Sequence, residues 1–482
     1  MLNQAKTPLL DALKDYINSN HAPFYTPGHK RGRGISSKLA QCFGSTVFQA
    51  DLPELPDLDN LFAPQGVIQE AQELAADAFG AARTWFLVNG STCGIAAAIL
   101  ANCDTGDKII LPRNVHQSAI AGLIFSGAIP IFVNPEYDPL LDITRSITLE
   151  GVEAALKQNS DAKAVMMVYP TYDGVCGDVE EVANLTHKYN IPLLVDEAHG
   201  AHFAFHPQLP KSALAAGADL TVQSIHKTLG ALTQASMLHV QGNRIDTDRL
   251  SKSLQLVQST SPSYLLLASL DAARQQMAVE GKYLMSRTLQ LAETARNKIS
   301  QIPGLSVLEL INPTPGFVAL DKTRLTVNVS GLGLTGFAAD EILVELGVIA
   351  ELPSLQNLTF IISLGNTEAD IEALVQAFTI LSTDYKQDKL IVASDRTYHL
   401  ESKLAITPRQ AFYAPTETLP IERSRDRICG ELVCPYPPGI PILMPGEIVT
   451  QDALDYLQQT QRLGSKISGC ADSSLKTLKV IR

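Results

Sequence analysis

The chain has few cysteines, and none of them is spaced for a metal or redox pair. Its 482 residues contain seven, and no Cys-x-x-Cys occurs among them. An odd and scattered set argues against a disulfide framework and is typical of a reducing compartment. We therefore expect a cytoplasmic protein whose cysteines bind no metal; they are Cys42, Cys93, Cys103, Cys176, Cys429, Cys434 and Cys470.

The chain also lacks an excess of positive charge. It has 38 lysine and arginine residues against 50 aspartate and glutamate residues, which gives a formal net charge of −12. This balance disfavours nonspecific binding to nucleic acid and slightly favours a small cationic substrate. No Gly-x-x-x-x-Gly-Lys-Ser/Thr loop is present, so the Asp-Glu-Ala-His letters at 196–199 do not indicate an ATP-driven motor.

Long apolar runs are missing as well. The first residues include Lys6 and Asp11 within a helical pattern, so we expect no apolar core of an export signal. The longest uncharged stretch, 118–135, is divided by Gly127 and Pro130, and it predicts a buried helix, a turn and a strand rather than a membrane span. With 45% hydrophobic and 18% charged residues the composition is that of an ordinary globular protein, and we expect no membrane partner.

Short apolar runs alternate with helical patterns from about residue 60 to 240. This alternation predicts an α/β fold with a mostly parallel, helix-covered sheet. A long helical stretch over 263–302 follows, and strand-like pieces at 325–329 and 358–364 predict a smaller α+β domain. The expected strands of the large sheet are 85–88, 108–111, 129–133, 164–168, 191–195 and 219–223. The expected parts of the chain are an N-terminal arm (1–60), a large domain (61–300), a small α+β domain (301–388) and a C-terminal α+β domain (389–482).

An acid and a lysine follow two of these expected strands. Asp196 ends the apolar run 191–195, and Lys227 closes the segment Ser224-Ile-His-Lys after the run 219–223. Ligands bind at the carboxyl ends of strands in open α/β sheets. Pyridoxal 5'-phosphate needs a lysine amine for its aldehyde and a carboxylate for its ring nitrogen, and these two residues supply both. Taken singly, a helix-capping aspartate and a solvated loop lysine are the alternatives.

Two further segments fit the same cofactor. Asn89-Gly-Ser-Thr-Cys-Gly94 lies between an expected strand and an expected helix, so Ser91 and Thr92 form a credible phosphate cradle, to which Ser224 adds a hydroxyl. His116 follows the strand 108–111 and offers a flat ring for stacking on the pyridine. A turn that only caps a helix, and a histidine that does the same, remain the alternatives.

The histidines at 199, 202 and 206 have a spacing that metal sites also use. Zinc requires a defined geometry with supporting hydrogen bonds, and histidines in a loop after a strand are more often polar packing. We therefore predict no metal at His199, His202 and His206.

The chain resembles the Orn/Lys/Arg decarboxylases of fold type I, the aspartate aminotransferase-like fold of pyridoxal-phosphate enzymes, and in particular the short Bacillus-type arginine decarboxylases. The resemblance runs over nearly the whole length. Gln117 and Cys93 depart from the pattern of the family, at positions that are not essential to the chemistry. The segments that carry it are Phe24-Tyr-Thr-Pro-Gly-His-Lys30, Ala50-Asp51, Asn89–Thr92, Pro112–His116, Asp196–Gly200, Ser224–Lys227, Tyr436–Pro441 and Pro445–Glu447.

The resemblance implies a role for each matched residue. Lys227 forms the Schiff base with the cofactor, Asp196 pairs with its ring nitrogen, and His116 stacks on its ring. His226 interacts with the substrate carboxylate or donates a proton. Around the cofactor, the family pattern places Ala198 against the opposite face of the ring, His199 also in contact with the cofactor, and Ser91, Thr92 and Ser224 on the phosphate.

The same resemblance implies a homodimer or a higher homo-oligomer, because Thr260 matches a residue that reaches the phosphate of the neighbouring subunit. Glu417 matches an acid that recognises the distal amino or guanidinium group of the substrate. For Arg31 and Arg33 a solvated loop is the default interpretation.

The expected reaction is α-decarboxylation of a basic amino acid, with L-arginine to agmatine preferred. L-Lysine, giving cadaverine, and L-ornithine are the alternatives, since an acidic residue pairs with any of the three side chains. Another pyridoxal reaction, such as aminotransfer or aldol cleavage, and a catalytically silent pyridoxal-binding protein are the rival functions.

Overall fold

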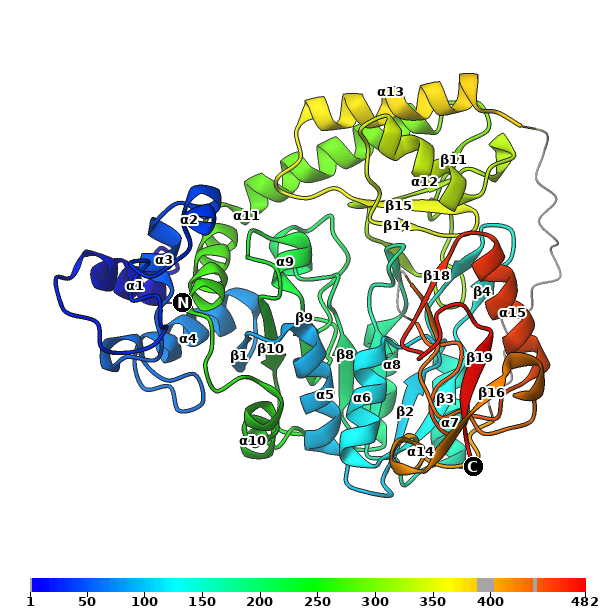
Figure 1. Cartoon of the computed structure of the whole chain (residues 1–482), viewed down its shortest axis with the longest axis horizontal. Helices are drawn as coiled ribbons and strands as arrows, with labels where there is room; N and C mark the ends of the chain where they lie inside the picture. The colour runs from blue at the N-terminus through cyan, green and yellow to red at the C-terminus, as the bar shows by residue number, and fades with distance from the viewer. Residues whose placement is uncertain (1, 388–402, 437–439) are drawn as a thin grey trace.

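A computed structural model describes residues 2–387, 403–436 and 440–482. Its centre is a seven-stranded sheet in the order β1-β10-β9-β8-β6-β2-β3 (Figure 1). Within the sheet β10 alone is antiparallel to its neighbours, which confirms the predicted mostly parallel α/β fold. The strands are β1 (Arg83–Leu87), β2 (Lys108–Pro112), β3 (Ile129–Val133), β6 (Ala164–Val168), β8 (Leu193–Asp196), β9 (Leu220–Gln223) and β10 (Ser236–Val240).

Alternate residues of each strand enter two hydrophobic cores, one on each face of the sheet. On one face Leu111 and Val222 pack with α5, α6 and α10; on the other Met167 and Val195 pack with α4, α7, α8 and α11. Burial on both faces explains why most of these strands are rich in apolar residues. The helices are α4 (Val67–Phe79), α5 (Gly90–Asn102), α6 (Gln117–Ser126), α7 (Leu149–Gln158), α8 (Val179–Lys188), α10 (Thr247–Val257) and α11 (Tyr264–Ile299).

The N-terminal segment forms α1 (Pro8–Asn18), α2 (Ser37–Phe43) and α3 (Thr46–Ala50), and α1 packs on α4 and α11. Arg31 donates hydrogen bonds to the carbonyls of Tyr16, Ile17 and Ser19 at the end of α1. Arg31 is therefore a half-buried helix cap rather than a solvated loop residue, because the last carbonyls of a helix need donors from outside it. Arg33 is exposed and donates to the carbonyl of Lys30.

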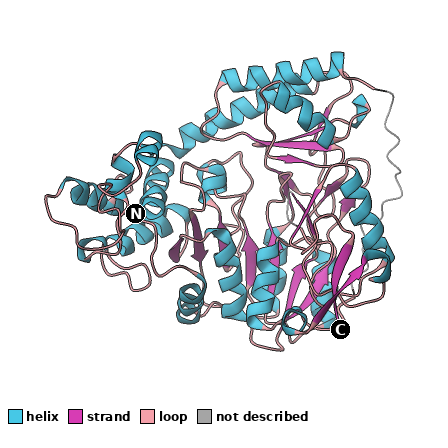
Figure 2. Ribbon diagram, viewed as in Figure 1, coloured by secondary structure: helices cyan, strands magenta, loops and turns pink. Residues whose placement is uncertain are grey.

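The long helix α11 leads into a four-stranded antiparallel sheet in the order β11-β13-β15-β14. Helices α12 (Gly336–Glu345) and α13 (Glu368–Asp384) cover it, as Figure 2 shows, which confirms the expected α+β region. The predicted strand at 358–364 runs too far, since the chain turns where the Asn366 amide donates to the Ser363 carbonyl. The strands are β11 (Ser306–Val307), β13 (Arg324–Asn328), β14 (Leu352–Pro353) and β15 (Asn357–Ile361).

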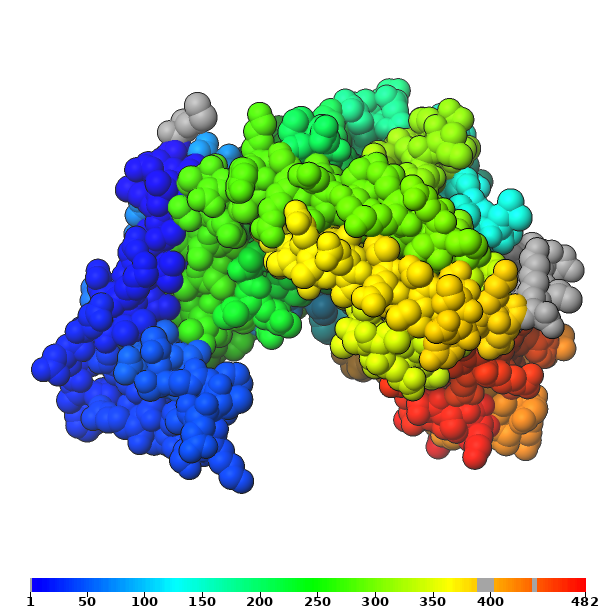
Figure 3. Space-filling view, turned by 90° about the horizontal axis from the view of Figure 1, so that it is seen from above, coloured from blue at the N-terminus to red at the C-terminus, as the bar shows by residue number. Residues whose placement is uncertain are grey.

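The C-terminal region pairs β16 (Thr416–Pro420) with β19 (Thr477–Ile481), and β17 (Cys434–Tyr436) with β18 (Lys466–Ser468). Helices α14 (Pro408–Tyr413) and α15 (Gln451–Arg462) complete it. Figure 3 shows this region and the N-terminal segment at opposite ends of the molecule, with a hollow between them.

The division of the chain at 60, 300 and 388 remains our proposal. Its last boundary lies outside the described residues, as do positions 437–439 of the proline-rich signature. No helix in the described part of the chain is long and apolar enough to cross a bilayer. All seven cysteines have free thiols.

Candidate active site

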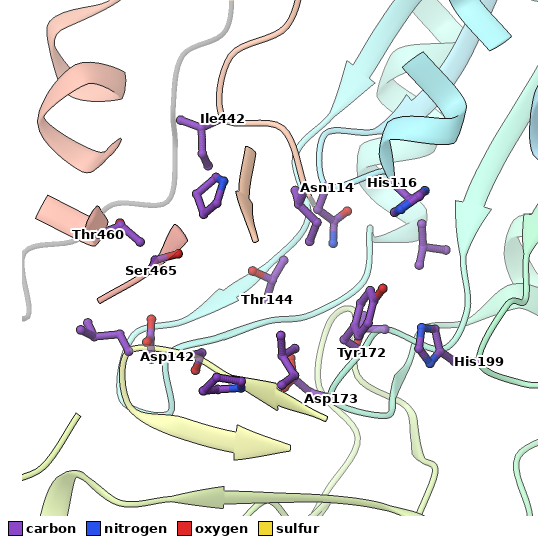
Figure 4. Close-up of a pocket in the computed structure, with 18 of the residues that line it drawn as sticks. Asn114, His116, Asp142, Thr144, Tyr172, Asp173, His199, Ile442, Thr460 and Ser465 are labelled. Atoms are coloured by element: carbon purple, nitrogen blue, oxygen red, sulfur yellow. The ribbon is translucent and has the colours of Figure 1, made fainter. Parts of the chain in front are cut away.

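The candidate active site is a cavity at the carboxyl ends of the parallel strands (Figure 4). Three parts of the chain line it. The large sheet contributes Ser91, Asn114, His116, Tyr172, Asp173, Asp196, Ala198, His199 and Lys227; the small sheet contributes Leu352 and Ser354; the C-terminal region contributes Ile442, Thr460 and Ser465. Strand ends deliver polar side chains to one edge, which is where α/β proteins bind ligands.

Lys227 reaches the cavity from α9 (Ile225–Thr228), a single turn that begins directly after β9. Its Nζ lies 2.9 Å from Nε2 of His199 and 5.4 Å from the centre of the Tyr172 ring. Burial lowers the pKa of Lys227, while the Asp196 carboxylate acts in the opposite direction. A lysine with a lowered pKa holds more of its amine in the neutral, nucleophilic form.

Asp196 is the last residue of β8, and it is buried. Its Oδ1 accepts a hydrogen bond of 3.2 Å from the amide of Ala198. Burial raises the pKa of Asp196, and His116 and Lys227 nearby lower it. A buried carboxylate of this kind needs a cationic partner, because charge is costly away from water.

His116 is the N-cap of α6, and it also lines the cavity. Its Nδ1 accepts from the Ser118 amide at 3.2 Å, so the proton of the neutral ring sits on Nε2. Burial lowers the pKa of His116 and keeps the ring neutral. His116 therefore caps a helix, as the alternative interpretation of the sequence had it, and also lines the cavity.

Two hydroxyls come together where α5 and α9 begin. Ser91 Oγ and Ser224 Oγ are 2.9 Å apart, and Gly90 before them has a φ of +72°, which favours glycine. Thr92 is exposed and does not line the cavity. Cys93, which departs from the family pattern, faces the core and donates to the Gly90 carbonyl.

Five of the predicted residues do not line this cavity: Thr92 and Ser224, described above, and His226, Thr260 and Glu417. His226 has its Nδ1 3.1 Å from the carbonyl of Ala235, and burial lowers its pKa. Thr260 lies exposed in the loop between α10 and α11. Glu417, on β16, accepts from Arg427 at 2.6 Å. The roles of His226, Thr260 and Glu417 remain predictions.

The histidines with metal-like spacing have separate partners. His202 Nε2 is 3.1 Å from Oδ2 of Asp321, and His206 Nε2 is 3.1 Å from Oγ of Ser286. His199 instead lies between Lys227 and Arg324.

Two cavity residues were missed from the sequence although a signal was present. Tyr172 and Asp173 belong to a polar turn after the strand 164–168, whose carboxyl end meets the same sheet edge. The ring centres of Tyr172 and His199 are 4.3 Å apart, and the two side chains are adjacent in Figure 4. Burial raises the pKa of Asp173 to about 6, and its Oδ1 accepts from the hydroxyl of Thr359 at 3.1 Å.

The fold is that of fold type I, the aspartate aminotransferase-like class. The chain belongs to the Orn/Lys/Arg decarboxylase family: the model of the major domain matches residues 7–323, and that of the C-terminal domain matches residues 392–473.

Relatives and solved structures agree with this family. An arginine decarboxylase of Halalkalibacterium halodurans is 42% identical, over 100% of this chain and 99% of the relative; one of Bacillus anthracis is 41% identical, over 100% and 98%. In structure the chain is similar to the lysine decarboxylase of Francisella novicida, with a TM-score of 0.84 and 22% identity over 99% of this chain and 81% of that one. Lysine decarboxylase A of Pseudomonas aeruginosa has the same TM-score, with 24% identity over 98% and 80%.

Proposed function

We propose that this protein is a pyridoxal 5'-phosphate-dependent decarboxylase that converts L-arginine to agmatine and carbon dioxide. The observation that carries the proposal is the convergence of Lys227, Asp196 and His116 on one cavity. The preference for arginine rests on relatives of about 40% identity over the whole chain that bear the name arginine decarboxylase.

The residues of the cavity fit the cofactor. Asp196 is a buried carboxylate suited to a protonated ring nitrogen, and Lys227 offers an amine to the aldehyde. The hydroxyls of Ser91 and Ser224 meet at the start of α5, where the helix dipole favours an anion such as phosphate. When bound, the cofactor supplies an electron-poor ring that takes up the electron pair of a bond broken at Cα.

Each of these side chains has a task in the proposed reaction. Asp196 keeps a proton on the ring nitrogen, because a buried carboxylate favours the cationic form of its partner. His116, neutral and flat, covers a face of the ring without adding charge. Lys227 would hold the cofactor through its amine and would be placed to return a proton to Cα. His226 is a second candidate for that proton, and Ala198 and His199 complete the proposed contacts with the cofactor.

The distal group of the substrate requires an acid. We propose Glu417 for this role, although it is paired with Arg427 and does not line the cavity of its own chain. In the proposed dimer or higher homo-oligomer, Glu417 of one subunit would supply this acid to the cavity of its neighbour. This arrangement requires that the surface that carries Glu417 faces the neighbouring subunit. The free cysteines support a cytoplasmic location.

The test is a comparison of three substrates. Purified protein with cofactor is incubated separately with arginine, lysine and ornithine, and the rates of amine formation are compared. Agmatine should form fastest. Faster formation of cadaverine or putrescine would mean that lysine or ornithine is the preferred substrate. Formation of a keto acid without carbon dioxide would indicate aminotransfer.

A further inference from the structure

Arg324 is a buried arginine whose charge is directed at a histidine. It begins β13, and its side chain is only 1% exposed. Its Nη2 lies 2.8 Å from Nδ1 of His199, whereas its Nε is 3.9 Å from the nearer oxygen of Asp321 and has no hydrogen-bond partner among the described residues. Buried arginines are normally held by close carboxylates, so the contact with His199 calls for a function.

This contact decides where His199 carries its proton. A guanidinium only donates hydrogen bonds, so Nδ1 of His199 has to accept through its lone pair. Burial, with the positive charges of Lys227 and Arg324, lowers the pKa of His199 well below its usual value. The ring is therefore neutral, and its proton sits on Nε2.

The proton on Nε2 in turn decides the form of Lys227. Nε2 of His199 is 2.9 Å from Nζ of Lys227. An ammonium has three donors and no acceptor, so it would place one donor against another. Only the neutral amine has a lone pair that accepts this hydrogen bond.

We propose that Arg324 is a positioning residue that acts through His199 to hold Lys227 as the neutral amine, with its lone pair directed into a hydrogen bond. The proposal rests on the proposed function, in which this amine bonds to the cofactor aldehyde. The charge of Arg324 acts in the same direction, since it and burial both lower the pKa of Lys227. Asp196 and Glu351 raise the pKa of Lys227, and Arg324 lowers it. His199 and the ring of Tyr172 lie next to its amine, and the other titratable groups that interact with it are His116 and His226.

The backbone around Arg324 is shaped to hold it. Gly174 has a φ of +85°, and a Cβ built there would lie 2.7 Å from Cβ of Arg324. The carbonyl of Gly174 accepts from the Asp321 amide at 2.9 Å. The turn that carries Tyr172 thus fits against Arg324, and a side chain at position 174 would displace it.

The test measures the titration of Lys227 in the apoprotein. The rate of acetylation of Lys227 by acetic anhydride is followed against pH by mass spectrometry of the peptide that contains it. The wild type should show a midpoint below the ordinary lysine value of 10.5. Arg324→Met, which removes donor and charge, should move the midpoint up, and Arg324→Lys, which keeps both, should leave it low. At a pH below the midpoint, an increase of one unit in the pKa of Lys227 reduces the labelling rate about tenfold.

Arg274→Met is the matched control. Arg274 is also fully buried, on α11, but it pairs with Asp271 and does not contact His199 or Lys227, so its loss should leave the midpoint unchanged. A wild-type midpoint at or above 10.5 would overturn the proposal, and this result needs no variant to fold. An Arg324→Met protein, folded by circular dichroism, that keeps the wild-type midpoint would also overturn it.

The apoprotein measurement separates this inference from the proposed function. No cofactor or substrate is present, so a shift of the midpoint in Arg324→Met supports the inference even if arginine is not a substrate. Conversely, the wild type could decarboxylate arginine while the midpoint of Arg324→Met stays at the wild-type value. That result would support the proposed function and contradict the role of Arg324.

Discussion

Asp196 and Glu197 are neighbours in sequence, but their carboxyl groups face different surroundings. Asp196 lines the cavity, whereas Glu197 points into the interior, where its Oε1 accepts from the Ala213 amide and its Oε2 from the Gln223 side chain. Burial raises the pKa of Glu197 to about 8, so it is protonated at neutral pH. One strand end therefore supplies one carboxyl group to the cavity and one to the interior.

We predict that Asp196→Asn retains cofactor binding but lowers kcat by about 10²-fold or more, because an amide does not favour a protonated ring nitrogen. Steady-state kinetics with arginine checks this, with cofactor content measured by absorbance. Full activity of the variant would mean that another group holds that proton.

The raised pKa of Glu197 makes stability depend on pH. The folded state binds this proton more tightly than the unfolded state, so stability falls as pH rises from about 4.5 to about 8, by up to about 1.4 kcal/mol per pH unit. Glu197→Gln does not ionise and should gain stability relative to the wild type over this window. Urea unfolding at pH 5 and pH 8 measures the difference; an equal difference at both values would contradict the assignment.

At the scale of single residues, the sequence predicted those that end strands of the large sheet. Asp196, His116 and Lys227 meet because the carboxyl ends of parallel strands share one edge. Arg324 could not be found in this way, since it starts a strand of a different sheet, and only the packing of the two sheets brings it to His199.

Among the seven strands of the large sheet, β10 is the one that was not predicted from the sequence. Strand β10 contains His239, which is fully buried between the hydroxyl of Thr84 and the side chain of Gln223. A histidine in the middle of a strand interrupts the apolar pattern, and only the neighbouring strands supply its partners. The antiparallel direction of β10 also has no signature in the chain itself.

Arg113, at the end of β2, connects the large sheet to the C-terminal region. It donates to the carbonyls of Pro441 and Ile442, and it forms a buried ion pair of 3.0 Å with Glu447. We predict that Arg113→Met lowers the free energy of unfolding by about 3–5 kcal/mol, because the Glu447 carboxylate is left buried without its partner.

Replacement of both partners provides the control for this ion pair. Arg113→Met with Glu447→Met should lose less stability than Arg113→Met alone, since no uncompensated charge remains. Urea denaturation gives both values. A single variant within about 0.5 kcal/mol of the wild type would show that the ion pair does not hold the C-terminal region.

For the whole molecule, the cavity depends on how distant parts of the chain come together. Ser354 follows the small-sheet strand β14 and Ser465 precedes β18 of the C-terminal region, yet both line the cavity with Lys227. The sequence predicted each part but not how they pack against one another. Thr260 and Glu417 do not line the cavity of their own chain, so their roles stay predictions.

We predict that complementary variants restore activity in a mixed dimer. Lys227→Ala and Thr260→Arg should each be inactive, but a heterodimer holds one site with Lys227 from one chain and Thr260 from the other. Equal mixing after refolding should recover roughly a quarter of the wild-type activity, because half of the dimers are mixed and each has one intact site. No recovery, with dimers present by ultracentrifugation, would place Thr260 outside the neighbouring site.

The most direct test of the account is the release of labelled carbon dioxide from carboxyl-labelled L-arginine by the wild type and by Lys227→Ala, each saturated with cofactor. We expect equal amounts of carbon dioxide and agmatine from the wild type, and a rate at least about 10³-fold lower from the variant. Turnover by Lys227→Ala at the wild-type rate would contradict it.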